Sequence, residues 1–245
     1  MHAYLINLDR SPERLATMDA RLRHLGIAYE RVPAIDGRRL PPRPGSHLSA
    51  GERGCLLSHM ETWRMIAERG EPYALVLEDD ALLSPRLPSF LADISWIPDD
   101  AGVIKLDTTG KPVLVDDRPR TTKAGANIVS LRSPHMGTSA YVISARAARS
   151  LAARDSGRPV DVALFELPHS DVPGATYQVD PALCRQDGGS ASAIAEDRKQ
   201  LRRQRGHVVY LHLAKAATFL RRRLDAGRAL AGRKVVRKII PFADR

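Results

Sequence analysis

Apolar residues in the first part of the chain follow two different spacings, and each spacing predicts a different element. Residues 3–8 (AYLINL) form a short apolar run, which is typical of a buried strand. Ser11 and Pro12 are a typical helix start, and apolar residues then recur at helical spacing until Gly26, the expected end of the helix. Residues 27–36 return to strand character. The chain therefore opens with a strand, a helix and a strand.

A longer helix and a central strand are expected next. Residues 37–48 are rich in proline and glycine and indicate an irregular surface loop. Ser49 and Glu52 have the spacing of a capping box, and the helix that they open should end at Gly70. The next apolar run, residues 72–80 (PYALVLEDD), lacks polar alternation, which indicates a central strand that is covered on both faces.

Four further strands are expected in the second half of the chain. They span residues 102–107, 126–132, 138–144 and 175–180, and a helix through Ala153 follows the third of them. Alternation of strands and helices predicts an α/β fold with a mainly parallel sheet and helices on both faces. A chain of 245 residues with 43% hydrophobic residues is long enough to build such a core.

The net charge of +10 is distributed unevenly along the chain. Residues 198–245 contain 15 lysines and arginines against two aspartates, which leaves 23 basic and 26 acidic residues in positions 1–197. The body is slightly acidic, which argues against a nucleic-acid-binding core, whereas the basic segment favours contact with an anionic surface. We expect an α/β domain over residues 1–197 and a separate basic tail over residues 198–245.

The basic tail has the pattern of an amphipathic helix. From His207 onward, apolar residues recur on one side and basic residues occupy the others. The apolar positions are Val209, Leu213, Ala217, Leu220, Leu224, Val235, Val236, Ile239 and Ile240. Such a helix can lie in a membrane interface, where each basic residue near anionic head groups contributes about 1 kcal/mol. A solvated helix that packs partly on the body is the alternative.

Targeting signals and cysteine usage point to the cytoplasm. No apolar run approaches the roughly 20 residues that span a bilayer, and the N-terminus lacks a basic segment followed by a long apolar one. Cys55 and Cys184 lie far apart without metal or redox spacing, so both are expected to be reduced core residues. We expect a cytoplasmic protein held peripherally, through its tail, on the cytosolic face of the inner membrane.

Three consecutive carboxylates, Glu78, Asp79 and Asp80, follow the central apolar run directly. In open α/β sheets the ligand crevice lies at the carboxyl ends of the strands, so these acids should point into a cleft. In an extended segment Glu78 and Asp80 would project to one side and Asp79 to the other. Adjacent carboxylates repel one another unless a cation or hydrogen bonds offset the charge, and Mg²⁺ or Mn²⁺ suits such oxygen ligands. For an isolated triplet, a solvated turn with helix-capping acids is the alternative.

Six segments of the chain carry recognisable motifs in a fixed order. They are residues 3–18, 51–66, 73–83, 135–144, 159–164 and 181–194. Together they resemble glycosyltransferase family 25, in particular the galactosyltransferases of lipooligosaccharide and lipopolysaccharide, and the resemblance covers about residues 3–195. It implies a GT-A-like nucleotide-sugar-binding fold, a UDP-sugar donor, commonly UDP-galactose, and transfer with inversion to a sugar hydroxyl of a glycolipid or oligosaccharide acceptor.

The resemblance also implies a metal site. The family's Glu-Asp-Asp motif corresponds to Glu78, Asp79 and Asp80, with the first and third acids as ligands of Mn²⁺ or Mg²⁺. GT-A enzymes commonly take a further ligand from a C-terminal loop, and three residues are available there: Gln186, Asp187 and His169. Of these, Asp187 is favoured.

Nucleotide contacts are implied at the end of the first strand and on the helix before the acidic triplet. The matching residues are Asn7, Leu8, Arg10, Arg14, Ser58 and His59, and Glu78 and Asp79 of the acidic triplet are also expected to contact the nucleotide. Arg10 or Arg14 is available to a phosphate, although either could instead pair with a surface acid. Ser58 and His59 match the family's Ser-His pair, and a hydrogen-bonded structural pair is the alternative for them.

Inverting transfer needs a general base that stands apart from the metal acids, because the acceptor attacks from the face opposite the leaving diphosphate. Asp161 matches the family's aspartate and is the expected base, with Glu166 as second choice; capping of the following helix is the alternative role of Asp161. His135 and Gly137 are candidates for the donor or acceptor pocket, although His135 could equally be a satisfied loop histidine. Residues 110–125 are polar and are a candidate lid.

Three other functions fit parts of the sequence. A catalytically inactive, membrane-associated sugar-binding or scaffold protein would keep the fold, but the intact Glu78, Asp80 and Asp161 argue for an enzyme. A nucleotidyltransferase would usually carry a glycine-rich phosphate loop near the first strand, and residues 7–14 (NLDRSPER) contain no glycine. A nucleic-acid-binding protein is favoured by overall charge alone. The sequence therefore predicts a metal-dependent inverting hexosyltransferase.

Overall fold

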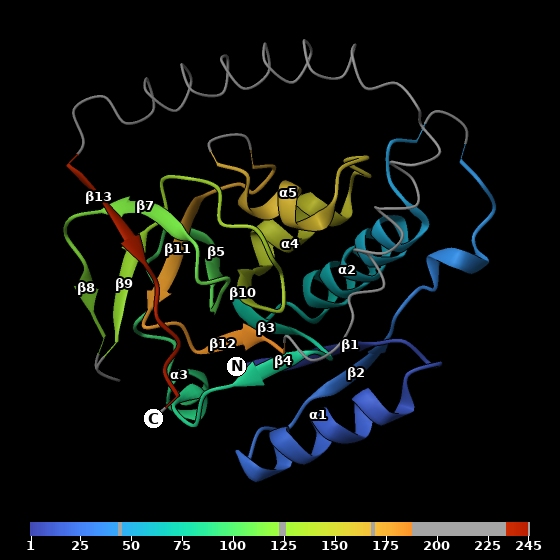
Figure 1. The fold of residues 1–245 in the computed structure, drawn as a ribbon, viewed down its shortest axis with the longest axis horizontal. Coiled ribbons are helices and arrows are strands. Elements are labelled where there is room, and N and C mark those ends of the chain that lie inside the picture. The colour runs from blue at the N-terminus through green and yellow to red at the C-terminus, as the bar shows by residue number, and fades with distance from the viewer. Residues whose placement is uncertain (44–45, 123–125, 168–169, 188–233, 245) are drawn as a thin grey trace.

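The computed structural model of the chain describes residues 1–43, 46–122, 126–167, 170–187 and 234–244. Its centre is an eight-stranded sheet with helices on both faces (Figure 1). In spatial order the strands are β2 (Glu30–Pro33), β1 (His2–Asn7), β3 (Tyr73–Glu78), β10 (Ala140–Ser144), β5 (Ala101–Lys105), β11 (Ala175–Asp180), β9 (Asn127–Ser130) and β8 (Arg120–Thr121). The α/β class and every strand expected before residue 197 are confirmed.

The sheet is mixed, which corrects the prediction of a mainly parallel one. β1 runs parallel to both of its neighbours, and β5 runs parallel to β11. β10 is antiparallel to β3 and β5, and β9 is antiparallel to β11 and β8. An apolar strand such as β10 reveals that both of its faces are buried, but its composition carries no information on its direction.

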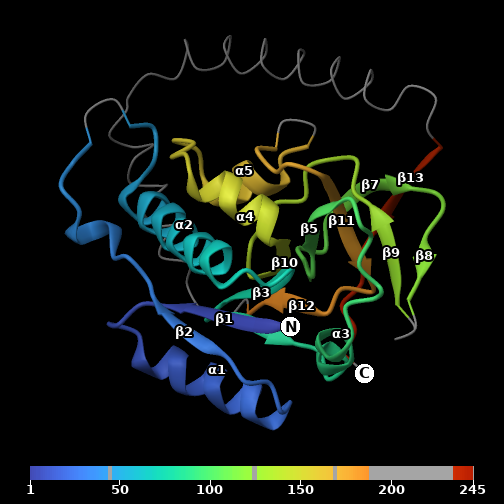
Figure 2. The same ribbon diagram turned by 180° about the vertical axis from the view of Figure 1, so that it is seen from behind.

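Alternate residues of the central strands face two separate cores. The helices that cover them are α1 (Pro12–His24), α2 (Ala50–Arg69), α3 (Leu87–Ala92), α4 (Ala145–Ala152) and α5 (Val160–Phe165). Ala3 and Leu5 pack toward α1 and α3, whereas Tyr4 and Ile6 pack toward α2, α4 and α5. Figure 2 shows α1 on one side of the sheet and α2, α4 and α5 on the other. The predicted double covering of the sheet is confirmed.

Short local signals set the ends of the two long helices. Ser49 and Glu52 form both halves of the predicted capping box at the start of α2. Gly70 ends α2 with φ 75°, a left-handed conformation that glycine adopts without steric cost. α1 begins with Pro12 as expected, but the Ser11 side chain makes no capping hydrogen bond.

A small three-stranded sheet brings a late part of the chain against the acidic triplet. It consists of β4 (Ala81–Leu83), β12 (Cys184–Gln186) and β6 (Asp107–Thr108). Beyond the end of β12, the Asp187 N–H donates to the Asp80 carbonyl oxygen at 2.7 Å. The predicted C-terminal loop near the metal acids therefore lies beside them.

The described end of the tail is a strand, which corrects the prediction of a helix there. β13 (Val235–Ile239) pairs antiparallel with β7 (Pro112–Asp116), and the following Ile240 is buried. Valine and isoleucine favour this pairing because branched side chains pack well on a pleated surface. The rest of the expected amphipathic helix lies outside the described residues, and within the described part no helix is long and apolar enough to cross a bilayer.

The candidate lid over residues 110–125 contains two strands. β7 pairs with the C-terminal β13, and β8 pairs with β9 at the edge of the main sheet. Backbone pairing holds these two parts of the segment to the body. A lid role for residues 110–125 stays a prediction.

Candidate active site

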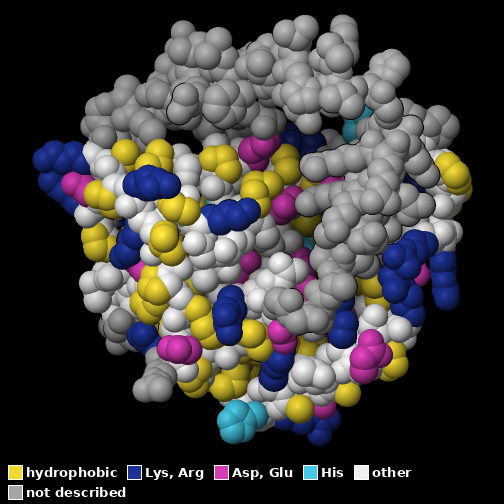
Figure 3. Space-filling model, in the orientation of Figure 1, with side chains coloured by type: hydrophobic (Ala, Val, Ile, Leu, Met, Phe, Trp, Pro, Cys, Tyr) yellow, Lys and Arg dark blue, Asp and Glu magenta, His cyan; other side chains and the backbone are white. Residues whose placement is uncertain are grey.

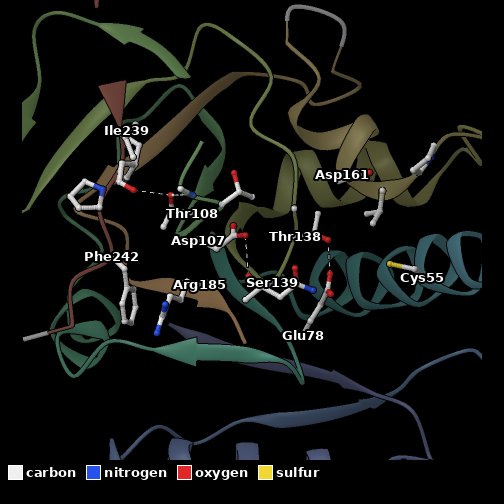
Figure 4. A pocket seen from close by; sticks show the side chains of 18 of the residues that line it. Cys55, Glu78, Asp107, Thr108, Thr138, Ser139, Asp161, Arg185, Ile239 and Phe242 are labelled. Carbon is white, nitrogen blue, oxygen red and sulfur yellow. Dashed lines mark hydrogen bonds between the residues drawn. The ribbon is translucent and has the colours of Figure 1, made fainter. Parts of the chain in front are cut away.

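Two adjoining cavities lie beside the carboxyl ends of β1 and β3. The larger has a volume of about 600 Å³ and the smaller of about 140 Å³. Cys55, Glu78 and Gln186 line both cavities, so the two meet at the end of β3. Acidic side chains lie in a hollow near the middle of this face (Figure 3), and Figure 4 shows the larger cavity from close by. The larger cavity has the size that encloses small-molecule ligands.

Glu78, the last residue of β3, is held from two sides. Thr138 Oγ1 donates to Glu78 Oε1 at 2.5 Å, and His59 Nε2 lies 3.3 Å from the same oxygen. His59 Nδ1 in turn lies 2.8 Å from Tyr141 Oη, which accepts a hydrogen bond from Trp63 Nε1. Burial raises the pKa of Glu78, but the interactions with His59 and Thr138 outweigh burial and bring the pKa below its ordinary value. Glu78 is therefore an ionised carboxylate where the cavities meet.

Asp79 joins the end of β3 to β1 and α1. Its carboxylate forms an ion pair with Arg14 and accepts a hydrogen bond from Asn7 Nδ2 at 2.7 Å. Burial raises the pKa of Asp79 in spite of these two partners. Asp79 and Asp80 form a turn after β3, so the alternation of an extended segment does not apply, and Arg14 contacts both acids.

Asp80 has one buried carboxylate oxygen without a hydrogen-bond donor among the described residues. Gln186 Nε2 donates to Asp80 Oδ2 at 2.9 Å, and Arg14 Nη2 lies 3.3 Å from the same oxygen. The other oxygen, Oδ1, is buried and has no hydrogen-bond partner among the described residues. Burial and the nearby charge of Glu78 raise the pKa of Asp80 to about 6. A buried acceptor with a raised pKa is the environment that a bound cation would relieve.

Arg14 has a buried hydrogen-bond donor that lacks an acceptor within the described ranges. Its Nε–H is buried and has no acceptor in the part of the chain that the structure describes, although its Nη2 pairs with Asp79 and Asp80. Buried polar groups are rarely left without a partner, so an unmatched donor beside an unmatched acceptor needs an explanation. A cation on Asp80 Oδ1 and an anion on Arg14 Nε would satisfy both. The oxygen ligands Glu78 and Asp80 fit a hard divalent cation.

All eight residues predicted to contact the nucleotide line the smaller cavity. They are Asn7, Leu8, Arg10, Arg14, Ser58, His59, Glu78 and Asp79. Arg10 Nε also donates to Asp36 at 3.0 Å. The Ser58 hydroxyl is engaged with backbone groups: it donates to the Gly54 carbonyl at 2.7 Å and accepts from the Ile35 N–H at 2.8 Å. The structure brings these residues together, and the bonds of Ser58 agree with the structural alternative.

The two candidate bases lie in different environments. Asp161 is in the first turn of α5 and lines the larger cavity, where its Oδ1 also accepts from the Val162 N–H at 2.9 Å. Glu166 does not line either cavity and pairs with Arg158 at 2.9 Å. Asp161 is therefore the candidate that can meet a ligand in the cavity.

The predicted third metal ligand, Asp187, forms an ion pair with an arginine of α1. The Asp187 carboxylate accepts from Arg21 Nη2 at 3.0 Å, and only its backbone N–H reaches Asp80. The neighbouring Gln186 contacts the Asp80 carboxylate instead. His169, the remaining candidate, lies outside the described residues. The structure therefore does not bring the Asp187 side chain into the acidic group.

Of the two candidates for the donor or acceptor pocket, His135 and Gly137, only Gly137 lines the larger cavity. His135 is a buried histidine whose Nδ1 lies 2.9 Å from Gln178 Oε1 and whose Nε2 accepts from the Thr109 N–H. Burial, together with the charge of Lys105, lowers the pKa of His135 to about 3, so its ring is neutral. His135 is therefore a histidine whose ring nitrogens are both hydrogen-bonded within the protein, which was the alternative to a pocket role. Gly137 lines the larger cavity as expected.

Several cavity residues had no signal strong enough to single them out. Asp107 lines the larger cavity, where its carboxylate accepts from Ser139 Oγ at 3.0 Å and pairs with the fully buried Lys105 at 2.7 Å. The sequence signal for this pair is that Lys105 and Asp107 lie two residues apart in an otherwise apolar strand. Cys184 is buried as predicted, whereas Cys55, also expected in the core, lines both cavities.

The larger cavity has an apolar wall from the end of the chain. Ile239, Ile240, Pro241 and Phe242 line it, and the Arg185 guanidinium lies over the Phe242 ring at 5.3 Å. Thr108 Oγ1 fixes this segment by donating to the Ile240 carbonyl at 2.8 Å. Figure 4 shows Phe242 on the left of the cavity, Asp161 at its upper right and Glu78 below Asp161.

Comparisons with known proteins find similarity to glycosyltransferases. Residues 1–164 match the family described as glycosyltransferase family 25 (LPS biosynthesis protein). The chain is 30% identical to the lacto-N-neotetraose biosynthesis glycosyltransferase LgtB of Neisseria gonorrhoeae, with 99% of this chain and 100% of the relative covered. It is also 30% identical to the LgtE glycosyltransferase of Neisseria meningitidis serogroup B, with 84% of each covered.

Two further similarities are more distant. The lipooligosaccharide biosynthesis protein lic2B of Haemophilus influenzae is 25% identical, with 76% of each chain covered. Among solved structures, a glycosyltransferase involved in the glycosylation of the major capsid of PBCV-1 superposes with a TM-score of 0.41 at 12% identity and covers 82% of this chain and 99% of its own.

Proposed function

The chain belongs to glycosyltransferase family 25, and we propose that it moves a hexose, galactose in the first instance, from a UDP-sugar to a saccharide of lipopolysaccharide or lipooligosaccharide. The proposed enzyme has a GT-A-like fold, depends on Mn²⁺ or Mg²⁺, and inverts the anomeric configuration. Two relatives are named for lacto-N-neotetraose biosynthesis, and a third, of which the chain covers 76%, is named for lipooligosaccharide biosynthesis, which supports the acceptor class.

The observation that carries the proposal is the pair of buried, unmatched groups at the end of β3. Asp80 Oδ1 lacks a donor and Arg14 Nε lacks an acceptor, and both belong to the group of residues around the smaller cavity. A nucleoside diphosphate with its divalent cation supplies both missing partners at once, because the cation meets the carboxylate and a phosphate oxygen meets the guanidinium. A sugar-binding site for neutral ligands would not need either.

The acids and the arginine have separate roles in this proposal. Glu78 and Asp80 hold the divalent cation, which, when bound, screens the charge that develops on the departing diphosphate. Arg14 donates to the phosphates and keeps Asp79 in place. Thr138 and His59 keep Glu78 ionised and oriented. The nucleotide then lies along the smaller cavity, and the sugar projects past Glu78 into the larger one.

Asp161 is the proposed general base. It lines the larger cavity from α5, apart from the acidic turn, as an inverting transfer requires. The Asp161 carboxylate takes the proton of the acceptor hydroxyl as that oxygen attacks the anomeric carbon. The hydrogen bond from the Val162 N–H to Oδ1 holds the carboxylate at the start of the helix.

The acceptor saccharide is proposed to enter between Asp161 and the C-terminal wall. Phe242 offers an aromatic face of the kind on which apolar faces of sugar rings stack, and Arg185 beside it offers donors to hydroxyl or acidic groups. This arrangement places the acceptor on the opposite side of the donor from the acids.

Membrane attachment is part of the proposal. We infer that the basic residues of the tail, positions 198–245, hold the protein peripherally on the anionic cytosolic face of the inner membrane. Co-sedimentation with anionic vesicles at low salt, lost when Arg221, Arg222 and Arg223 are changed to glutamate, tests this. Equal co-sedimentation of that variant and the unchanged protein would reject it.

A donor screen tests the enzymatic proposal. UDP-sugars are incubated with the protein and Mn²⁺ or Mg²⁺, and release of UDP is measured with and without a lipooligosaccharide acceptor. Release is expected with one UDP-hexose and should be lost in Asp80→Ala. The inactive sugar-binding or scaffold protein, the alternative function, would bind a UDP-sugar without releasing UDP.

A further inference from the structure

Cys55, His59 and Glu78 bring three metal-binding groups of different chemistry together. Cys55 and His59 lie four residues apart on α2, so both project from one face of the helix. Their ligand atoms and those of Glu78 all lie within 4.8 Å of one another. In Figure 4 the Cys55 sulfur points from α2 toward Glu78. This group lies beside the acidic triplet and shares with it the carboxylate of Glu78, which His59 also contacts.

We propose that Cys55, His59 and Glu78 form a second metal site, which takes a borderline-soft divalent ion and Zn²⁺ above all. A thiolate and an imidazole select zinc over Mg²⁺ or Mn²⁺, whereas the carboxylates of the Asp80 site suit the hard ions. Three protein ligands are available: Cys55 and His59 from α2, and Glu78 from the end of β3. Cys55 and Glu78 both line the two cavities, so a water or ligand that completes the coordination would come from there.

The geometry of His59 suits this role. His59 Nε2 lies 3.3 Å from Glu78 Oε1, and two ligands about 2.1 Å from a tetrahedral ion lie about 3.4 Å apart. The other ring nitrogen, Nδ1, lies 2.8 Å from Tyr141 Oη, and a hydrogen bond there fixes the ring orientation of a metal-binding histidine. Zn²⁺ would bind the Nε2 lone pair of the neutral ring, whose proton then lies on Nδ1 and is donated to Tyr141 Oη, and the thiol proton of Cys55 would pass to solvent.

Because both sites use Glu78, metal binding at the second site affects metal binding at the first. A zinc ion on Glu78 takes a ligand from the Mn²⁺ or Mg²⁺ site, so the two ions compete. This consequence rests on the proposed function, whereas the existence of the zinc site does not. The two sites are distinguished by Cys55, which belongs to the second alone, and by Asp80, which belongs to the first alone.

Co²⁺ titration of the metal-free full-length chain tests the site, because a thiolate ligand gives Co²⁺ a near-ultraviolet charge-transfer band. The sequence has only two cysteines, so the band comes from Cys55 or Cys184. We expect one equivalent of Co²⁺ to produce the band in the unchanged protein, in Cys184→Ala and in Asp80→Asn. Cys55→Ser should lose the band and bind Zn²⁺ at least about 100-fold more weakly. A band that is absent from the unchanged protein, or that survives Cys55→Ser, would overturn the proposal.

A measurement on the unchanged protein removes any dependence on variant folding. Zn²⁺ should protect Cys55 from alkylation, measured by mass spectrometry of its peptide, whereas Mg²⁺ should not. Equal alkylation with and without Zn²⁺ would contradict the site. The electron paramagnetic resonance signal of free Mn²⁺ then reports competition: Zn²⁺ should release bound Mn²⁺ from the unchanged protein but not from Cys55→Ser. A thiolate band without this release would refute the competition and leave the zinc site intact.

Discussion

Replacing Asp80 by asparagine should make the metal-free protein more stable at neutral pH. The Asp80 side chain is 11% exposed, one of its oxygens has no partner among the described residues, and its pKa is raised from 3.8 to about 6. Each pKa unit corresponds to about 1.4 kcal/mol, so ionised Asp80 costs the folded state roughly 3 kcal/mol relative to the neutral side chain. Asparagine keeps the shape and an acceptor for Gln186 but not the charge.

The expected gain is smaller than this because the new amide hydrogens need acceptors beside Glu78. We expect Asp80→Asn to raise the free energy of unfolding by about 2 kcal/mol, or Tm by about 4–8 °C in a chain of this length. The raised pKa means that the folded protein binds more protons than the unfolded chain between pH 3.8 and about 6, so Asp80 lowers stability as pH rises through this window. The advantage of the variant should therefore be present above about pH 7 and vanish near pH 4.

Urea denaturation in EDTA at several pH values measures this difference. Asp99→Asn, at an exposed aspartate, is the matched control and should show no such pH-dependent gain. Mn²⁺ at 100 times its Kd should stabilise the unchanged protein by about 2.7 kcal/mol and leave Asp80→Asn unaffected. Destabilisation by Asp80→Asn at pH 7.5 without metal, or a gain that is equally large at pH 4, would refute the assignment of a strained, buried carboxylate.

Three further substitutions follow from the site. Asp161→Asn should lower kcat for transfer by at least about 100-fold while UDP-sugar binding, measured by calorimetry, stays within threefold; unchanged transfer would remove Asp161 as the base. Phe242→Ala should raise the acceptor KM by about 10-fold and leave UDP release without acceptor unchanged, and an unaltered acceptor KM would exclude the C-terminal wall from acceptor binding. Tyr141→Phe removes the hydroxyl that holds His59, so Mn²⁺ affinity through Glu78 should fall by about 10-fold in calorimetry; full affinity would show that the ring needs no such support.

Local sequence signals were sufficient where one segment determines its own structure. The capping box at Ser49, the glycine end of α2 and the apolar runs of β1 and β3 all predicted what the chain forms. The carboxyl ends of β1 and β3 meet at one sheet edge, so Asn7 and the acidic triplet, which was expected to point into a cleft, line the same cavity.

Features that depend on distant partners could not be predicted in this way. The direction of β10 is set by its two neighbours, and β13 is a strand because β7 offers it an edge. The pairing of Asp187 with Arg21 across the fold likewise left Gln186 as the residue that contacts Asp80. Apolar content and helical spacing are properties of single segments, so they do not predict which segments pair or pack together in the fold.

Calorimetric titration of Mn²⁺ in the presence of UDP tests the central claim most directly, namely that Glu78 and Asp80 hold a divalent cation beside a nucleoside diphosphate. We predict uptake of one Mn²⁺ that strengthens when UDP is present, and loss of that uptake in Asp80→Asn. No uptake by the unchanged protein with UDP, or equal uptake by Asp80→Asn, would contradict the account.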